Sequence, residues 1–184
     1  MILALTGYRG SGKTTVARVL AERLGDTSHL VDLDAVVVQQ AGQTIAELFR
    51  NGGESAFREL ESAALHGVLT RARVCSGTTV LALGGGTLID RAANMAALRD
   101  AGATIVYLAC DPEVLAERIR RDAATAGQRP GLTAAGVDPA AEVLEVLTRR
   151  EPQYRAAADQ SLDVTGRSPE DVADAILAMR GNRS

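Results

Sequence analysis

The most specific chemical pattern in the sequence is the glycine-rich stretch GYRGSGKT at residues 7–14. It satisfies the motif Gly-x-x-x-x-Gly-Lys-Ser/Thr, whose glycines let the backbone curl so that successive N–H groups face a phosphate. In such a loop Lys13 reaches the β- and γ-phosphates, and Thr14 offers its hydroxyl to Mg²⁺. The helix that follows adds the positive end of its dipole. We therefore expect a nucleotide to bind at six consecutive residues: Gly10, Ser11, Gly12, Lys13, Thr14 and Thr15.

Lys13 is the only lysine in the chain, although the sequence holds 20 lysine and arginine residues together. A lysine ammonium is a compact point charge, whereas a guanidinium is planar and forked and is too wide for a site wrapped by backbone. The alternative is a chance match to the motif. The position of this lysine, between an expected strand and an expected helix, favours the phosphate site.

Asp32 and Asp34 supply the acidic groups that the glycine-rich loop lacks. They end a short apolar run, and alternate residues of an extended segment point to the same side, so both carboxylates would face one site. One would serve Mg²⁺, directly or through water, and the other the hydroxyl of an acceptor molecule. A solvated loop or a cap for the next helix is the alternative. Their place directly after a strand favours a functional role.

The elements that must position these residues follow from the apolar pattern. Short apolar runs of strand length occur at residues 2–6, 29–32, 78–83, 103–109 and 161–165. Between them lie helical patterns at residues 14–24 and 55–73, and helix starts with a first-turn proline at Pro112 and Pro169. Continuous apolar strands that alternate with helices predict a parallel sheet covered on both faces. Ligands bind at the carboxyl ends of such strands.

The chain is expected to form a single domain over residues 1–184, because no internal repeat and no Pro- or Ser-rich linker divides it. Residues 120–138 differ from the rest, since they are small, include three glycines and show no apolar period. A segment of this kind is either disordered or a mobile lid over a ligand site.

Composition and charge narrow the class of partner. The net charge of −3 and the aromatic content of 3% argue against a nucleic-acid partner. No apolar run approaches membrane-spanning length, which argues against a membrane partner. Cys75 and Cys110 stand far apart without a metal-ligand spacing, as in proteins of a reducing compartment. We therefore predict a cytoplasmic protein, a monomer, whose ligands are small molecules.

Two large classes of nucleotide-binding protein do not fit the sequence. A GTPase needs an Asn-Lys-x-Asp motif to read guanine, and the chain has no second lysine with which to form one. Motor-type ATPases usually carry an acidic residue at the end of a buried strand near the loop. Here the corresponding strand at residues 78–83 ends in glycines instead of a carboxylate.

Six segments resemble the shikimate kinase family in order and spacing: GYRGSGKTT, VDLD, GESAFRELE, LALGGG, QRPGL and RREPQYR. The resemblance extends from Ile2 to the last helix. It implies an α/β fold of the P-loop NTPase class, with a five-stranded parallel sheet flanked by helices as in nucleoside-monophosphate kinases, and a lid. It also implies an ATP-dependent kinase that uses Mg²⁺ and transfers the γ-phosphoryl of ATP to the 3-hydroxyl of shikimate. That reaction is a step of chorismate and aromatic amino acid biosynthesis.

On the acceptor side, the resemblance implies that Asp34 holds the 3-hydroxyl and acts as a base. Arg58 would bind the shikimate carboxylate, with Glu61 one helical turn on to orient it. Arg150 would be the second arginine for that carboxylate. Taken alone, Arg58 and Glu61 would also fit a surface ion pair, and Arg150 a cation at a helix end. The backbone of three glycines would approach the shikimate ring: Gly84, Gly85 and Gly86.

On the nucleotide side, the resemblance implies that Asp32 supports Mg²⁺ beside Thr14. Arg118 and Arg167 match positions that flank the adenine. Arg129, from the Arg-Pro pair of the QRPGL segment, would be the lid residue that closes on the phosphates. The residues that carry catalysis would then be Asp34, Lys13 and Arg129.

The sequence departs from the family pattern at residues 129–132, which read Arg-Pro-Gly-Leu where a leucine more often follows the proline. Arg9 occupies a variable position of the loop and is assigned no role. Two alternative functions stay open: another small-metabolite kinase of this fold, such as gluconate kinase, or a nucleotide-binding module without turnover. The FRELE segment together with the three glycines favours shikimate. A pure binder, moreover, has no use for an acid on the acceptor side.

Overall fold

The computed structural model describes residues 1–121 and 139–181 of the chain. The lid predicted at residues 120–138 lies almost wholly between these two ranges, so it is outside the described residues, as is Arg129. All the other predicted site residues are described, and they lie on loops, on helices and, for Asp32, at the end of a strand.

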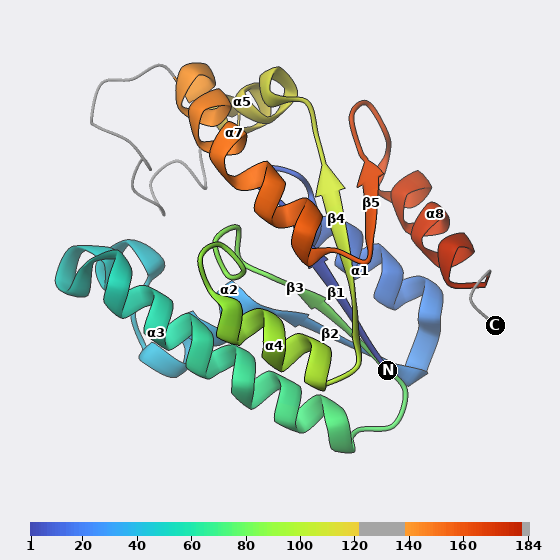
Figure 1. The fold of residues 1–184 in the computed structure, drawn as a ribbon. Helices are drawn as coiled ribbons and strands as arrows, with labels where there is room; N and C mark the ends of the chain where they lie inside the picture. Colours follow the sequence, from blue (N-terminus) through green and yellow to red (C-terminus); the bar gives the residue numbers. More distant parts are fainter. Residues whose placement is uncertain (122–138, 182–184) are drawn as a thin grey trace.

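Five strands of the described chain form one parallel sheet in the order β2-β3-β1-β4-β5, which confirms the predicted architecture (Figure 1). Because all the strands run in the same direction, their carboxyl ends meet at one edge, where ligands of such sheets bind. The bounds of the strands are β1 (Ile2–Thr6), β2 (Ser28–Asp32), β3 (Thr78–Ala82), β4 (Ala103–Ala109) and β5 (Gln160–Asp163).

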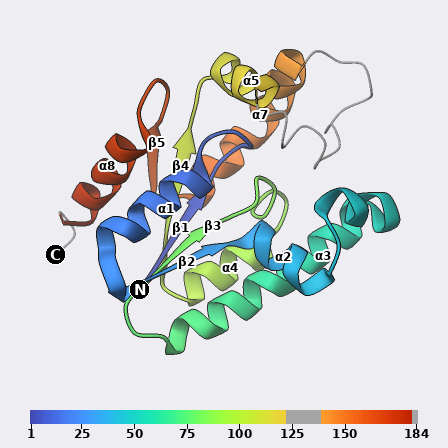
Figure 2. The same ribbon diagram turned by 180° about the vertical axis from the view of Figure 1, so that it is seen from behind.

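Helices cover both faces of this sheet (Figures 1 and 2). Helices α1 and α8 lie on one face, and α2, α3 and α4 lie on the other. Helices α5 and α7 pack against each other near the carboxyl end of β4. Their bounds are α1 (Lys13–Leu24), α2 (Leu33–Ala41), α3 (Ile45–Val74), α4 (Ala92–Asp100), α5 (Pro112–Arg121), α7 (Pro139–Ala157) and α8 (Pro169–Gly181).

The central strand β1 explains why the apolar runs of the sequence are continuous. All five of its residues are buried. Leu3 and Leu5 belong to the core shared with α1 and α8, whereas Ile2 and Ala4 belong to the core under α2, α3 and α4. Because successive side chains of a strand point to opposite faces, a strand covered on both faces favours apolar residues at consecutive positions, as at Ile2–Leu5.

Helix α5 continues into the segment that was predicted as a lid. Arg120 and Arg121 form its last turn, and both guanidinium groups pair with the carboxylate of Glu117. Residues 120 and 121 of the segment predicted as a lid are therefore helical, and the rest of that segment lies outside the described residues. Ion pairs between residues three and four positions apart stabilise a helix, and here they support two residues that have no apolar period.

Helix α3 begins at Ile45, well before the start that the apolar pattern predicted at residue 55. A capping box closes its first turn, in which Thr44 and Glu47 each bond the other's backbone N–H group. Gly53 has a φ of 72° and kinks the helix. Arg58 and Glu61, which were predicted to bind and orient the acceptor carboxylate, lie after this kink.

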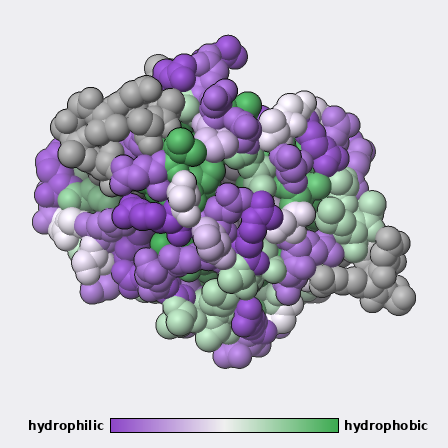
Figure 3. Space-filling view, turned by 45° about the horizontal axis from the view of Figure 1, so that its top comes forward, coloured by the Kyte–Doolittle hydropathy of each residue, from purple (hydrophilic) through white to green (hydrophobic). Residues whose placement is uncertain are grey.

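Hydrophilic residues predominate on the surface when the carboxyl ends of the strands are tilted toward the viewer (Figure 3). Among the described helices, none combines the length and the apolar character that crossing a membrane requires.

Candidate active site

The loop between β1 and α1 has the backbone shape that its glycines predicted. Gly10 has a φ of 81°, and Gly12, which precedes the first residue of α1, has a φ of 90°. These left-handed conformations are open to glycine at no steric cost. The ammonium of Lys13 lies over the loop and donates to the carbonyl oxygens of Gly7 and Tyr8, both at 2.9 Å.

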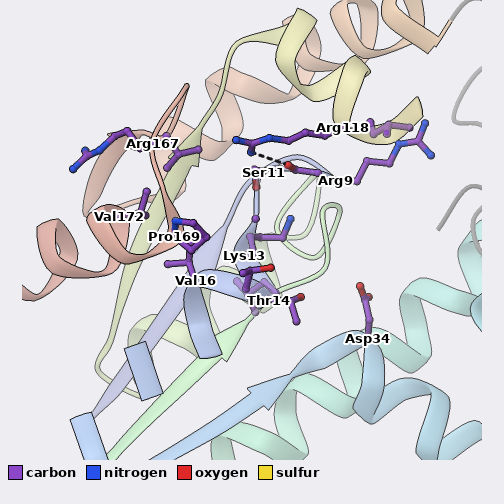
Figure 4. Close-up of a pocket in the computed structure, with 16 residues that line it drawn as sticks. Arg9, Ser11, Lys13, Thr14, Val16, Asp34, Arg118, Arg167, Pro169 and Val172 are labelled. Atoms are coloured by element: carbon purple, nitrogen blue, oxygen red, sulfur yellow. Dashed lines mark hydrogen bonds between the residues drawn. The ribbon is translucent and has the colours of Figure 1, made fainter. Parts of the chain in front are cut away.

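A cavity of about 540 Å³ extends from this loop (Figure 4). Its volume is within the usual range for small-molecule and cofactor sites. Arg118 crosses above the loop and donates to the carbonyl oxygen of Gly10 at 3.2 Å. Arg167 lies at one end of the cavity, with the apolar side chains of Pro169 and Val172 close by. The predicted nucleotide residues that line the cavity are Gly10, Ser11, Gly12, Lys13, Thr14, Thr15, Arg118 and Arg167.

Asp34 lies at the other end of this cavity, with Lys13 between it and Arg167 (Figure 4). The structure corrects one premise here, since Asp34 stands in the first turn of helix α2 and not on an extended segment. The helix begins directly after Asp32, the last residue of β2, because the Asp32 side chain accepts from the backbone N–H of Ala35 at 3.2 Å. Asp34 faces the site because the start of α2 is placed at the carboxyl edge of the sheet.

Asp32 has two partners, and both of the roles considered from the sequence have a basis in its geometry. It caps helix α2, and it also accepts a hydrogen bond of 2.6 Å from the hydroxyl of Thr14. A hydroxyl and a carboxylate are hard oxygen donors of the kind that Mg²⁺ binds, usually together with waters and substrate phosphates. These two residues therefore fit a magnesium site. Among the described residues, no group of three or more His, Cys, Asp or Glu side chains could hold a metal ion without such added ligands.

A second cavity adjoins the first and shares Asp34 and Arg9 with it. Its walls come from the glycine-rich loop, α2, α3, the loop after β3, and α7. The predicted acceptor residues that it brings together are Asp34, Arg58, Gly85, Gly86 and Arg150. Its remaining lining residues are Tyr8, Arg9, Ile45, Phe49, Phe57 and Glu61. The site thus combines carboxylates, three arginines and an apolar wall.

Arg58 is held firmly within this second cavity. Its Nη1 atom donates to Glu61 at 2.8 Å, while its Nε and Nη2 atoms donate to Glu54 at 3.3 and 3.1 Å. Its guanidinium also lies 5.2 Å from the centre of the Phe57 ring. Burial alone would lower the pKa of Arg58, but the carboxylates of Glu61 and Glu54 raise it above its ordinary value. The guanidinium therefore stays charged at any working pH.

Glu61 anchors this arginine from a fully buried position. Its second carboxylate oxygen accepts from the hydroxyl of Thr87 at 2.7 Å. The backbone carbonyl of Thr87 in turn accepts from the side chain of Asn94 at 2.8 Å. This buried chain of hydrogen bonds fixes Glu61 and, through it, the Nη1 side of Arg58.

The three glycines after β3 are required mainly by neighbouring side chains. A Cβ at Gly84 would lie 2.2 Å from a carboxylate oxygen of Glu61, and one at Gly86 would lie 2.2 Å from a guanidinium nitrogen of Arg58. Gly84 lies behind Glu61 and lines neither cavity, unlike Gly85 and Gly86. Because no side chain fits at these positions, the backbone of the loop lies directly against the second cavity, which we call the acceptor cavity.

Tyr154 connects helix α7 to this glycine loop. Its hydroxyl donates to the carbonyl oxygen of Gly85. Burial raises the pKa of Tyr154 to about 12, against the opposing effect of Arg150, so the phenol remains a neutral donor. Arg150 lies one turn earlier on the same helix, and the contact at Tyr154 sets the position from which it reaches the cavity.

Several residues of the site escaped the sequence reading. Glu54 lies in the GESAFRELE segment but has no predicted role of its own, Thr87 and Asn94 belong to no motif, and Arg9 occupies a variable position of the loop. Arg9 lines both cavities and pairs with Glu142 of helix α7 at 3.2 Å. Its charge inside the phosphate-binding loop was the one available signal.

The arrangement is suited to moving a group between two bound molecules. One cavity has the features of a phosphate site, the other has cations for an anionic partner, and a carboxylate lies at their junction. Holding two reactants in line is the main contribution that a protein makes to phosphoryl transfer.

A family model described as shikimate kinase matches residues 9–180 of this chain. Over 175 residues the chain is 43% identical to a shikimate kinase of Rhodopirellula baltica, which covers 95% of this chain and 88% of the relative. It is 39% identical to a shikimate kinase of Salinispora arenicola, over 97% of this chain and 96% of the relative. The solved structure of shikimate kinase from Acinetobacter baumannii in complex with shikimate superposes with a TM-score of 0.86 and 32% identity, covering 100% of this chain and 94% of that one. This chain belongs to the shikimate kinase family.

Proposed function

We propose that this protein transfers the γ-phosphoryl group of ATP to the 3-hydroxyl of shikimate, with Mg²⁺, to give shikimate 3-phosphate and ADP. The observation that carries the proposal is the position of Asp34, which lines the phosphate cavity and the acceptor cavity together. A related solved structure contains shikimate, which supports a small hydroxylated acid as the acceptor.

On the nucleotide side, the ammonium of Lys13 exchanges its two carbonyl partners for phosphate oxygens. The exchange is favourable because a hydrogen bond to a charged acceptor is stronger than one to a neutral carbonyl. Thr14 and Asp32 hold the magnesium ion, whose charge offsets that of the phosphates. Arg118 and Arg167 flank the base of the nucleotide. The role of Arg129 on the phosphates rests on the resemblance alone, because this residue lies outside the described part of the chain.

On the acceptor side, Arg58 and Arg150 grip the carboxylate of shikimate from two different helices. Two guanidinium groups fix the orientation of a carboxylate, because each presents donors in a planar fork. Asp34 accepts a hydrogen bond from the 3-hydroxyl of shikimate and thereby directs the hydroxyl oxygen at the γ-phosphorus. It takes the hydroxyl proton as the bond between that oxygen and the γ-phosphorus forms and the bond to ADP breaks. The backbone of Gly85 and Gly86 lies along the ring.

The experiment that tests this function is a coupled assay of ADP release with shikimate, gluconate and no added acceptor. The proposal expects turnover with shikimate that is at least 100-fold above the rate without acceptor. Preferential turnover of gluconate would assign the chain to a different kinase activity. ATP binding without turnover on any hydroxy acid would identify a binding module.

A further inference from the structure

The hydroxyl of Tyr8 is a buried polar group without a hydrogen-bond partner in the described part of the chain. The side chain is 1% exposed, and it lines the acceptor cavity but not the nucleotide cavity. Buried tyrosines normally satisfy their hydroxyl, as Tyr154 does with the carbonyl of Gly85. A phenylalanine would fill the same space without the cost of an unpaired hydroxyl. Apart from the neighbouring Arg9 side chain, the described residues offer this hydroxyl no polar partner, so its proton is available to a group from outside the described part of the chain.

The surroundings of this hydroxyl are charged, and they belong to the α7 side of the acceptor cavity. Burial raises the pKa of Tyr8, Arg9 and Arg150 lower it, and Glu142 raises it, with burial the largest effect. The phenol is therefore neutral at ordinary pH, and it is able both to donate and to accept a hydrogen bond. Asp34 lines the same cavity from helix α2.

Arg9 adds a second buried donor to the same wall. One of its terminal nitrogens pairs with Glu142 at 3.2 Å, but its Nε atom is buried and has no partner in the described chain. Residues 8 and 9 are two of the four variable positions of the phosphate-binding motif. In this chain they bring hydrogen-bonding groups to the acceptor cavity, where the motif itself requires none.

We propose that the Tyr8 hydroxyl forms a hydrogen bond with an oxygen atom of the bound acceptor, which makes Tyr8 an additional acceptor-binding residue. The inference rests on the proposed function only in so far as a hydroxylated carboxylic acid occupies this cavity. Such a molecule carries oxygens on its ring and on its carboxylate, and either kind is a suitable partner for a neutral phenol. The bond forms only in the complex, so its formation favours binding without contributing to the stability of the free protein.

The test is the substitution Tyr8→Phe in the full chain, with steady-state kinetics, calorimetric binding of shikimate and thermal unfolding. One hydrogen bond contributes enough to raise the dissociation constant and KM for shikimate about 3- to 10-fold. The KM for ATP stays unchanged, and the Tm of the free protein is unchanged or higher. Tyr107→Phe is the matched control, because Tyr107 is equally buried, lies on strand β4 and lines neither cavity. It is expected to leave the shikimate constants unchanged.

Analogues of shikimate identify the oxygen that is contacted. Three analogues are compared: one with a hydroxymethyl group in place of the carboxylate, one without the 4-hydroxyl and one without the 5-hydroxyl. The effect of Tyr8→Phe is expected to disappear with the analogue from which the partner oxygen has been removed. Three results would overturn the inference. The substitution could affect every analogue equally, it could change shikimate binding by less than 1.5-fold, or it could lower the Tm in proportion to the loss of binding. Failure of the proposed function has a separate signature, because the wild-type protein itself would then neither bind nor turn over shikimate.

Discussion

Arg58 donates through Nη1 to the buried carboxylate of Glu61 over 2.8 Å. The same guanidinium presents its other edge, Nε and Nη2, to Glu54, whose side chain is 55% exposed. One carboxylate thus anchors the arginine from within the protein, while the other holds the more exposed edge, on which we propose that the substrate carboxylate binds. The two glutamates are therefore expected to have opposite effects on acceptor binding.

Glu61→Gln is expected to weaken acceptor binding and to destabilise the protein. The amide still accepts one bond but leaves the buried guanidinium of Arg58 without its closest counter-charge, and breaking such a pair commonly costs about 3–5 kcal/mol. We expect the Tm to fall and the KM for shikimate to rise about 10-fold, with the KM for ATP unchanged. Glu59→Gln, at an exposed position on the same helix, is the control. An unchanged shikimate KM would show that Glu61 does not orient Arg58.

Glu54→Gln is expected to strengthen acceptor binding. Removal of its charge eliminates a competitor for the Nε and Nη2 edge of Arg58, and exposed ion pairs of this kind contribute about 0.2–1 kcal/mol. The KM for shikimate should fall up to about 5-fold, without a change in the KM for ATP. A higher KM would mean that Glu54 assists the binding of shikimate and does not compete with it.

Thr14→Val is expected to weaken the magnesium-dependent binding of nucleotide. The hydroxyl of Thr14 pairs with Asp32 at 2.6 Å, and the substitution removes one oxygen ligand while it keeps the shape of the side chain. Titration of ADP by calorimetry should show an affinity loss of about 10-fold or more at saturating Mg²⁺ and little loss without the metal. Thr14→Ser should restore the wild-type response. Equal losses with and without Mg²⁺ would point to a packing defect instead.

Because its three tyrosines are buried, the protein is expected to lose stability above pH 10. The chain has three tyrosines and no tryptophan, and burial raises the pKa of each: that of Tyr154 to about 12, and those of Tyr8 and Tyr107 above the ordinary value. In the unfolded chain tyrosine releases its proton near pH 10. Between about pH 10 and 12 the folded state therefore binds more protons than the unfolded state, so the free energy of unfolding falls as the pH rises. The slope approaches about 1.4 kcal/mol per pH unit for each tyrosine.

Absorbance at 295 nm and circular dichroism, recorded together from pH 8 to 12, check this expectation. Without tryptophan the absorbance change reports tyrosinate directly. It should appear only together with the loss of helical signal. Titration of the tyrosines near pH 10 in a protein that stays folded would contradict the description of these side chains as buried.

The local features of the site were predictable because they are encoded by neighbouring residues. The phosphate-binding loop is one contiguous motif, and its glycines alone dictate a shape that places Lys13 and Thr14 at the cavity. The sheet was predictable for a similar reason, since strands covered on both faces read as continuous apolar runs. The Arg58–Glu61 contact is also local, because residues three apart are neighbours on a helix.

The features that escaped prediction depend on packing between distant segments. Asp34 lies on a helix because the Asp32 carboxylate accepts a hydrogen bond from the backbone N–H of Ala35. This bond caps the helix and ends the extended backbone at Asp32. Thr87 supports Glu61 only because the loop after β3 packs against α3. That the Tyr8 hydroxyl has no geometric hydrogen-bond partner among the described residues becomes visible only once the surroundings of that side chain are known.

The substitution Asp34→Asn tests the central claim most directly, namely that a carboxylate between the two cavities positions the acceptor hydroxyl and takes its proton. Asparagine has nearly the same shape but no charge, and loss of a general base typically lowers the rate by about 10²- to 10⁴-fold. We predict a kcat at least 100-fold below that of the wild type, measured by coupled ADP release, with the affinity for ATP retained. A kcat close to that of the wild type would contradict the account.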